Sequence, residues 1–151
     1  MTSSDLYKTI EYIANKCNDL KDKYIDEDLK IDYVCIFSQS QEEYEKLLDA
    51  AHNIGSIVDE TSTGPVFKFN NLRKTIIGSP KVLKIRIPEK TRTERGDVDF
   101  ITDYENFKNK YFDNNRFKLI KRERFEMLEL KDPEFNIIAY FSSIPPSKLL
   151  L

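Results

Sequence analysis

The sequence has few of the residues that most often mark a catalytic site. It contains one histidine, two cysteines, four glycines and no tryptophan among 151 residues. It has no glycine-rich dinucleotide or phosphate loop, no Gly-x-Ser-x-Gly elbow and no His-Glu-x-x-His zinc motif. The single histidine, His52, is predicted near the end of a helix, where a cation interacts favourably with the free C-terminal carbonyl groups. A serine or cysteine nucleophile would therefore lack its usual base.

Long apolar runs and an excess of one charge are also missing. No apolar stretch approaches the roughly 20 residues that span a bilayer, and residues 1–5 lack the basic and apolar regions of a secretory signal. Lys and Arg number 24 against 26 Asp and Glu, which predicts no general attraction to nucleic acid or to an anionic membrane. Cys17 and Cys35 show no paired spacing. We expect a cytoplasmic protein without a nucleic-acid or membrane partner.

What the sequence does contain is one pattern that occurs twice. A strand-like run at 31–37 leads into an acidic and aromatic helical stretch, and a run at 98–102 does the same. Further strand-like runs follow each helical stretch. The pattern predicts an α+β fold in which two βαβββ units, 31–87 and 97–141, form one mixed sheet shaped like a cup. Paired units of this kind usually carry a site inside the cup.

Segments outside the two units have their own patterns. Residues 1–30 are predicted to be a helical extension, because apolar residues recur at spacings of three and four over 4–24. The tail, 142–151, contains two prolines and ends in three leucines. Such an apolar end more often packs on its own domain or on a partner than it extends into solvent.

Hydroxyl residues and a glycine mark the predicted helix ends. Ser3 or Ser4 is expected to cap the first helix, and the segment 38–40 precedes the second. Gly55 is expected to end the second helix in the left-handed conformation. These positions set the boundaries between the helices and the strands.

The order of these elements resembles that of the vicinal-oxygen-chelate superfamily, which includes glyoxalases, bleomycin-resistance proteins and relatives of extradiol dioxygenases. The likeness rests on Ile-Asp-Tyr-Val at 31–34 and Asp-Pro-Glu-Phe-Asn at 132–136, and it covers 31–141. The helical N-terminus and the charged linker 88–96 are similar to the YecM-like branch of this group. The resemblance implies a single domain built of two βαβββ repeats.

The resemblance also implies where a metal would bind. Strand-borne ligands of the superfamily fall here on Tyr33, on Asp97 or Asp99, and on Ala139. None of these positions has the usual residue, since a methyl group cannot hold a cation and one carboxylate is too few for a divalent site. We therefore expect no metal and no cofactor.

Polar side chains on the predicted inner face are the candidate ligand-binding residues. Two-residue alternation turns Tyr33 inward and gives the strand at 82–87 a cationic face. A pair of cations beside carboxylates could orient a small anionic ligand, or the charges could neutralise one another across the strands. The candidates are Tyr33, Lys84, Arg86, Asp97, Asp99 and Glu126.

Three functions agree with these observations. The first is a metal-free binding module that holds a small anionic ligand or a protein partner in or beside the cup. The second is a divalent-metal enzyme of the isomerase, lyase or dioxygenase class, with a carboxylate site made of Asp97, Asp99 and Glu126. The third is a structural or assembly protein that pairs through sheet edges or the N-terminal helix. Each of these functions is compatible with a homodimer.

Overall fold

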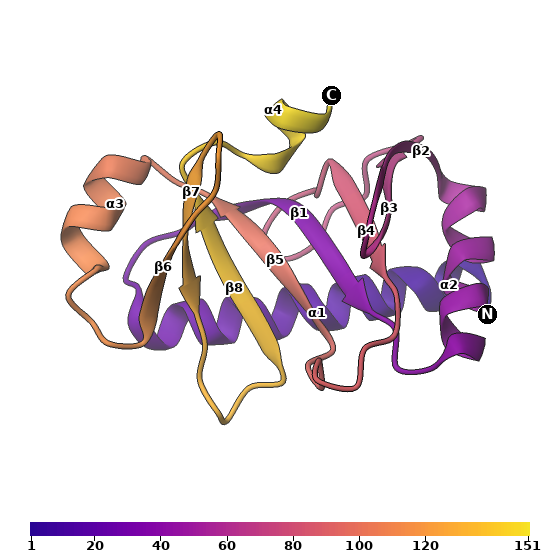
Figure 1. Ribbon diagram of the computed structural model, residues 1–151, viewed down its shortest axis with the longest axis horizontal. Coiled ribbons are helices and arrows are strands. Elements are labelled where there is room, and N and C mark those ends of the chain that lie inside the picture. The colour runs from indigo at the N-terminus through magenta and orange to yellow at the C-terminus, as the bar shows by residue number, and fades with distance from the viewer.

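The computed structural model describes residues 1–151 and shows helices around one eight-stranded mixed sheet (Figure 1). The elements in chain order are α1 (Ser3–Tyr24), β1 (Lys30–Phe37), α2 (Gln41–Ile54), β2 (Gly55–Thr61), β3 (Gly64–Phe69), β4 (Val82–Arg86), β5 (Gly96–Ile101), α3 (Tyr104–Tyr111), β6 (Phe117–Lys121), β7 (Glu126–Leu130), β8 (Ile137–Ser142) and α4 (Pro146–Leu150). The order βαβββ occurs twice, from β1 to β4 and from β5 to β8. The predicted α+β class, with tandem units and an N-terminal helix, is confirmed.

The two units share one internal arrangement and meet in the middle of the sheet. The strand order is β2-β3-β4-β1-β5-β8-β7-β6. In each unit the first strand pairs in parallel with the last one, β1 with β4 and β5 with β8. The first strands of the two units, β1 and β5, pair antiparallel. The repeat seen in the sequence therefore corresponds to a repeat in space.

Helix α1 covers one face of this sheet (Figure 1). Its apolar residues recur on one stripe, as a surface helix requires, and the stripe is buried against residues of both units, including Val34, Val98 and Ala139. Burial of each large aliphatic side chain stabilises the fold by about 1.5 to 3 kcal/mol. The buried residues of the stripe are Leu6, Ile10, Ile13, Ala14, Cys17 and Leu20. None of the helices has both the length and the apolar character needed to cross a membrane.

Side chains satisfy the free amide groups at the starts of the two long helices. Thr2 caps α1, rather than either of the serines that follow it, and forms a reciprocal pair with Asp5. The Thr2 amide donates to the Asp5 carboxylate at 2.8 Å, and the Asp5 amide donates to the Thr2 hydroxyl at 3.1 Å. Ser40 caps α2 by accepting from the Glu43 amide at 3.1 Å.

Gly55 differs from the expectation for a helix end. Its φ of −166° is extended rather than left-handed, and the residue begins β2 directly after α2. A glycine suits this position because a Cβ would lie only 2.4 Å from the carbonyl oxygen of Lys68 on β3. Close approach of two strands, not a helix stop, accounts for this glycine.

Candidate functional site

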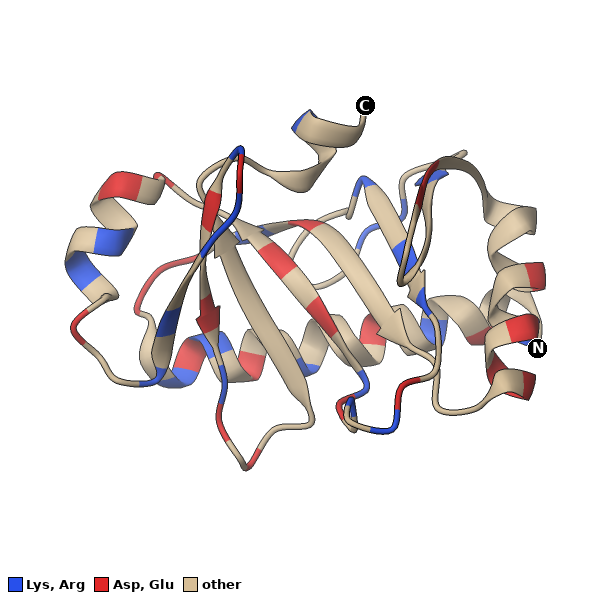
Figure 2. Ribbon diagram, viewed as in Figure 1, with Lys and Arg blue, Asp and Glu red and all other residues tan.

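The sheet borders a partly open cavity of about 370 Å³ on the face opposite α1. Strands of both units and the C-terminal helix α4 contribute to its wall, so the cup predicted from the repeat is present. Figure 2 shows acidic positions along β5, in the middle of the sheet, and basic positions on β4. The lining residues are Tyr33, Asp59, Thr61, Val66, Lys84, Asp97, Asp99, Phe125, Met127, Tyr140, Pro146, Leu149 and Leu150.

Strand register explains why four of the six candidate residues meet in this cavity. Cys35 on β1 is paired with Lys84 on β4 and with Asp97 on β5, which places these three residues in one row across the sheet. Paired residues on neighbouring strands point to the same face. Tyr33 and Asp99 are partners in the next row. Tyr33, Lys84, Asp97 and Asp99 therefore all line the cavity.

Asp97 is the least satisfied polar group of the site. The residue is 8% exposed, and its Oδ1 atom has no hydrogen-bond partner. Burial, together with the nearby Asp99, raises the pKa of this carboxyl to about 8, and Lys84 opposes the change. Asp97 is therefore mostly protonated at neutral pH. The ionisable groups that interact with it are Tyr33 and Cys35 on β1, Lys84 and Arg86 on β4, Asp99 on β5, Arg92 in the linker, Tyr140 on β8 and Cys17 on α1.

Asp99 is also buried, but it has protein partners. Its carboxylate accepts hydrogen bonds from the Ser142 amide at 3.3 Å and from the Ser142 hydroxyl at 2.5 Å. Burial raises its pKa to about 7, and the bonds from Ser142 act in the opposite direction. Asp99 is thus held in place by β8, while Asp97 keeps an oxygen free.

Lys84 and Tyr33 present hydrogen-bond donors to the same cavity. The Lys84 ammonium donates to the Thr63 hydroxyl at 2.6 Å, and burial lowers the pKa of the amine. Burial also raises the pKa of the Tyr33 phenol well above its usual range, with Cys35 and Asp97 adding to the effect. The phenol therefore keeps its proton, and the amine loses its proton more readily than an exposed lysine does.

Arg86 lies on the same strand face but does not line the cavity. Its guanidinium donates to Glu89 at 2.8 Å and lies 5.7 Å from the centre of the Phe37 ring. Arg92 of the linker approaches the same ring at 6.0 Å. Arg86 is already paired with a carboxylate and an aromatic ring, so its role as a direct ligand-binding residue is not supported by the geometry.

Glu126 does not belong to the cavity, contrary to its place among the candidates. The carboxylate accepts bonds from the Tyr104 hydroxyl and from the Lys108 ammonium of α3, both at 2.7 Å. Its chain neighbours Phe125 and Met127 are the residues that line the cavity. Because side chains alternate along a strand, the residue between them faces away. Asp97, Asp99 and Glu126 therefore do not come together as metal donors.

On the last strand, β8, the residue that faces the cavity is one position away from the residue expected there. Ala139, the position onto which a family metal ligand was carried, belongs to the core on the α1 side. The residue of β8 that faces the cavity is Tyr140, which is paired with Asp99 in the sheet and donates to Glu129 at 2.9 Å. No group of three or more His, Cys, Asp or Glu side chains is arranged to hold a metal ion.

The C-terminal helix closes part of the cavity and was not part of the predicted site. Leu149 and Leu150 of α4 line the wall, and Asp32 of β1 holds the helix. The Asp32 carboxylate accepts from the Ser147 amide at 2.8 Å and from the Ser147 hydroxyl at 2.6 Å. Asp32 reaches this side because the pairing of β1 with β5 is irregular between Ile31 and Tyr33. Without this irregularity, simple alternation would put Asp32 on the opposite face from Tyr33.

Replacement of Asp32 by alanine is expected to release α4 from the cup. Both hydrogen bonds to Ser147 are lost, and the free energy of unfolding should fall by about 1 to 3 kcal/mol. Limited digestion with trypsin should then cut faster after Lys148, within the helix. Ser147→Ala keeps the backbone bond and should have a smaller effect on both measurements. A tail that stays as resistant as in the unchanged protein would show that Asp32 does not hold it.

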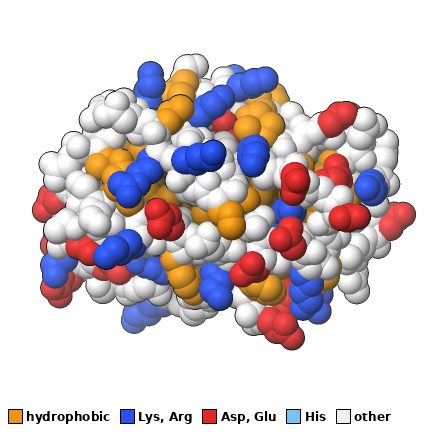
Figure 3. All heavy atoms as spheres, turned by 180° about the vertical axis from the view of Figure 1, so that it is seen from behind, with side chains coloured by type: hydrophobic (Ala, Val, Ile, Leu, Met, Phe, Trp, Pro, Cys, Tyr) orange, Lys and Arg blue, Asp and Glu red, His pale blue; other side chains and the backbone are white.

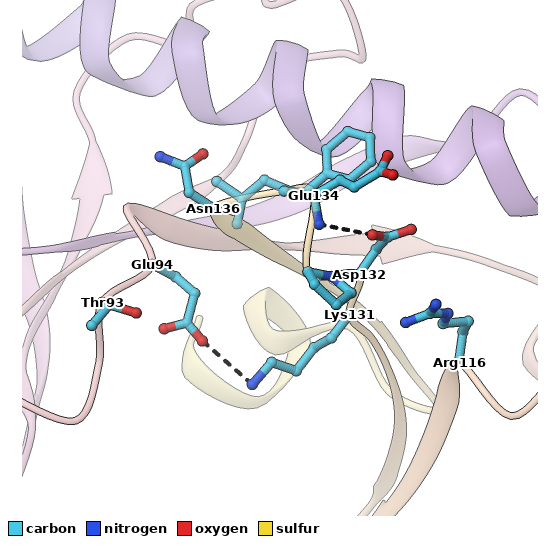
Figure 4. Close-up of a pocket in the computed structure, with 10 residues that line it drawn as sticks. Thr93, Glu94, Arg116, Lys131, Asp132, Glu134 and Asn136 are labelled. Carbon is cyan, nitrogen blue, oxygen red and sulfur yellow. Dashed lines mark hydrogen bonds and ion pairs between the residues drawn. The ribbon is translucent and has the colours of Figure 1, made fainter.

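A second hollow of about 550 Å³ lies where the linker before β5 approaches the turn before β8 (Figure 4). Most of its charged groups are already paired. Lys131 forms an ion pair with Glu94 at 3.3 Å, and Asp132 accepts from the Lys23 ammonium at 2.7 Å and from the Glu134 amide at 2.9 Å. These bonds lower the pKa of Asp132. The hollow is built mainly of structural ion pairs, so the cup is the better candidate site.

The face of the molecule seen from behind shows no single large apolar or charged patch (Figure 3). Seen from behind, hydrophobic side chains form separate patches between charges of both signs (Figure 3). His52 is exposed at the end of α2, and its ring packs edge-on against Phe67 at 5.1 Å. Both cysteines are buried and free. The apolar tail was expected to pack on its own domain or on a partner, but the sequence did not indicate that it would line the cup. It contained no signal for Tyr140 either, because both placements depend on how distant segments meet.

Comparisons with known proteins bear on the fold. No protein-family model matches the sequence, and no curated protein matches it. A solved structure described as "Structural Genomics, Protein EC4020" superposes with a TM-score of 0.74 over 97% of this chain and 90% of that one, at 10% sequence identity. At this identity the likeness establishes a shared fold alone. The chain therefore has an arrangement of helices and strands that also occurs in an experimentally determined protein.

Proposed function

We propose that this protein is a binding module, related to the vicinal-oxygen-chelate group, that holds a small carboxylate or carbonyl compound in the cup without a metal. The observation that carries the proposal is the free Oδ1 atom of Asp97, which is buried at the wall of a cavity. A buried polar atom without a partner costs free energy that a ligand can recover. The site therefore favours a ligand that supplies a hydrogen-bonding oxygen atom.

Three donors of the cavity suit such an oxygen atom. The Lys84 ammonium, the Tyr33 hydroxyl and the protonated Asp97 carboxyl all lie on its wall. Because its pKa is raised to about 8, Asp97 keeps its proton at neutral pH and can donate a hydrogen bond to an anion instead of repelling it. The acidic row of β5 is thus compatible with an anionic ligand.

The rest of the wall suits an apolar body. Val66, Phe125, Met127, Leu149 and Leu150 surround the polar row, as is typical of small-molecule sites in which a few polar groups fix the orientation. A volume of about 370 Å³ is at the low end of the range for ligand pockets. We therefore favour a short-chain compound with one carboxylate or carbonyl group.

Calorimetric titration with butanoate and hexanoate tests this function. Both should bind at pH 6 and bind about tenfold or more weakly at pH 9, because Asp97 and Asp99 on the wall then ionise and repel the carboxylate. Butylamine, a cation of similar size, should show the opposite dependence. Binding of butylamine alone would overturn the proposal.

Variants identify the groups responsible for that dependence. Asp97→Asn keeps a neutral donor and should bind butanoate at both pH values, which removes the part of the pH effect due to Asp97 and leaves the part due to Asp99. Lys84→Met should abolish binding at both. Glu126→Gln changes a carboxylate outside the cavity, so it serves as the matched control and should bind as the unchanged protein does.

A further inference from the structure

Lys84 has surroundings unlike those of the other lysines of the chain. It is the only lysine on the wall of the cup, where an apolar surface adjoins a row of polar groups. Its amine has one protein partner, the Thr63 hydroxyl at 2.6 Å, and no carboxylate within ion-pair distance. A hydroxyl holds the amine in position without requiring it to stay charged. The amine is thus oriented toward a cavity and is not neutralised by an acid.

The acid that a carbonyl addition would need lies in the same row. Asp97 and Lys84 are paired with Cys35 from its two sides, so both face the cavity. Asp97 is more than nine-tenths buried, and its Oδ1 is the one fully buried carboxyl oxygen on this wall without a hydrogen-bond partner. Nucleophilic amines of this kind are typically desolvated lysines beside a group that transfers protons.

We propose that Lys84 captures aldehydes or ketones in the cup as a reversible imine, with Asp97 as the proton carrier. The inference rests on the proposed ligand site and adds a covalent step to it. The ligand class becomes short-chain carbonyl compounds, with simple carboxylates as non-reacting analogues. No metal or redox partner takes part.

Each step balances in atoms and charge. The lone pair of the neutral Lys84 amine forms a bond to the carbonyl carbon, and the π electrons move to oxygen, which takes the proton of Asp97. The nitrogen then returns one proton to the Asp97 carboxylate, which gives a neutral carbinolamine. Asp97 next protonates the hydroxyl group, which leaves as water while the C=N bond forms. The resulting iminium ion faces the Asp97 carboxylate, and addition of water reverses the sequence.

Reductive trapping tests the inference. The full-length protein is incubated with butanal and sodium borohydride, and the modified residue is located by mass spectrometry of peptides. We expect Lys84 to gain a butyl group about tenfold or more faster than any other lysine. Lys68→Met, which removes an exposed lysine of β3, is the matched control and should leave the reaction unchanged. Equal modification of many lysines, or none at Lys84, overturns the inference.

Two variants separate this inference from the binding function. Lys84→Arg keeps the positive charge but cannot form an imine, so it should lose trapping and still bind butanoate. Asp97→Asn should bind butanoate and be trapped about tenfold more slowly, because its amide cannot carry the proton. Butanoate binding without trapping in the unchanged protein would refute the imine alone. If the unchanged protein neither binds butanoate nor is trapped, the site as a whole is refuted. Circular dichroism checks that each variant is folded.

Discussion

Asp97→Asn should make the protein more stable at pH 8 and leave its stability at pH 4 nearly unchanged. The carboxyl has a pKa of about 8 in the folded protein and about 3.8 in the unfolded chain. Below pH 4 it is protonated in both states and contributes no penalty. Between pH 4 and 8 it ionises in the unfolded chain only, so the free energy of unfolding decreases as the pH rises. Asparagine has the shape of the protonated carboxyl and no charge, and it removes this loss.

The expected gain at pH 8 is on the order of a few kcal/mol, since each pKa unit corresponds to about 1.4 kcal/mol. Urea denaturation at several pH values between 4 and 8 measures it, and the variant should show a flatter dependence. Asp99, whose pKa is about 7, should supply much of the slope that remains. Asp113→Asn, in an exposed turn, is the matched control and should keep the original slope. A variant that is no more stable at pH 8 would mean that Asp97 is ionised in the folded protein.

Such a cost is expected at a functional site. A carboxyl group buried without a partner lowers the stability of the free protein, and a ligand that bonds to it recovers part of the loss. Leucine at position 97 would remove the same penalty, but it would also fill the polar row with an apolar side chain. The stability measured for Asp97→Asn and the ligand binding of the same variant therefore test two consequences of one buried group.

Local patterns in the sequence were sufficient to predict the fold. The strands show β-branched and aromatic alternation, the helices show apolar stripes, and the repeated order gives the two units. Alternation also predicted that four candidate residues, Tyr33, Lys84, Asp97 and Asp99, share the inner face, because the strands keep a regular register from Tyr33 onward. Regular local geometry is the part of a structure that sequence spacing encodes directly.

Predictions were wrong where a contact between distant segments decides the outcome. Asp32 faces α4 because the ladder of β1 and β5 is irregular beside it, and no residue type marks that irregularity. Glu126 was grouped with the inner-face candidates, but it follows the alternation of β7 to the other side and contacts Tyr104 and Lys108 of α3 instead. The role of Gly55 depends on the approach of Lys68, thirteen residues later, which a helix-end rule does not consider. Each of these positions required the pairing partner to be known.

Phe141→Ala should cause the largest loss of stability of any substitution considered. Phe141 is fully buried on the α1 side of β8 and lies 4.5 Å from the ring centre of Phe107 and 5.3 Å from that of Phe100. Removal of such a ring leaves a cavity and forfeits its aromatic contacts, at a cost of about 3 to 5 kcal/mol. For a chain of this length the melting temperature should fall by about 10 °C. Phe112→Ala, at an exposed ring after α3, is the control and should change it little.

Two neighbouring residues of β8, Tyr140 and Phe141, allow the contributions of the cavity face and the core face to be measured separately. Tyr140 is adjacent to Phe141 in the chain but faces the cavity, where its hydroxyl donates to Glu129. Tyr140→Phe keeps the ring, and it should alter butanoate affinity more than thermal stability. Phe141→Ala should do the reverse at a temperature where the variant stays folded. If Phe141→Ala changed the affinity while Tyr140→Phe changed only the stability, the cavity would not be the binding site. Ligand binding would then depend on the core face of β8 and not on the face that lines the cavity.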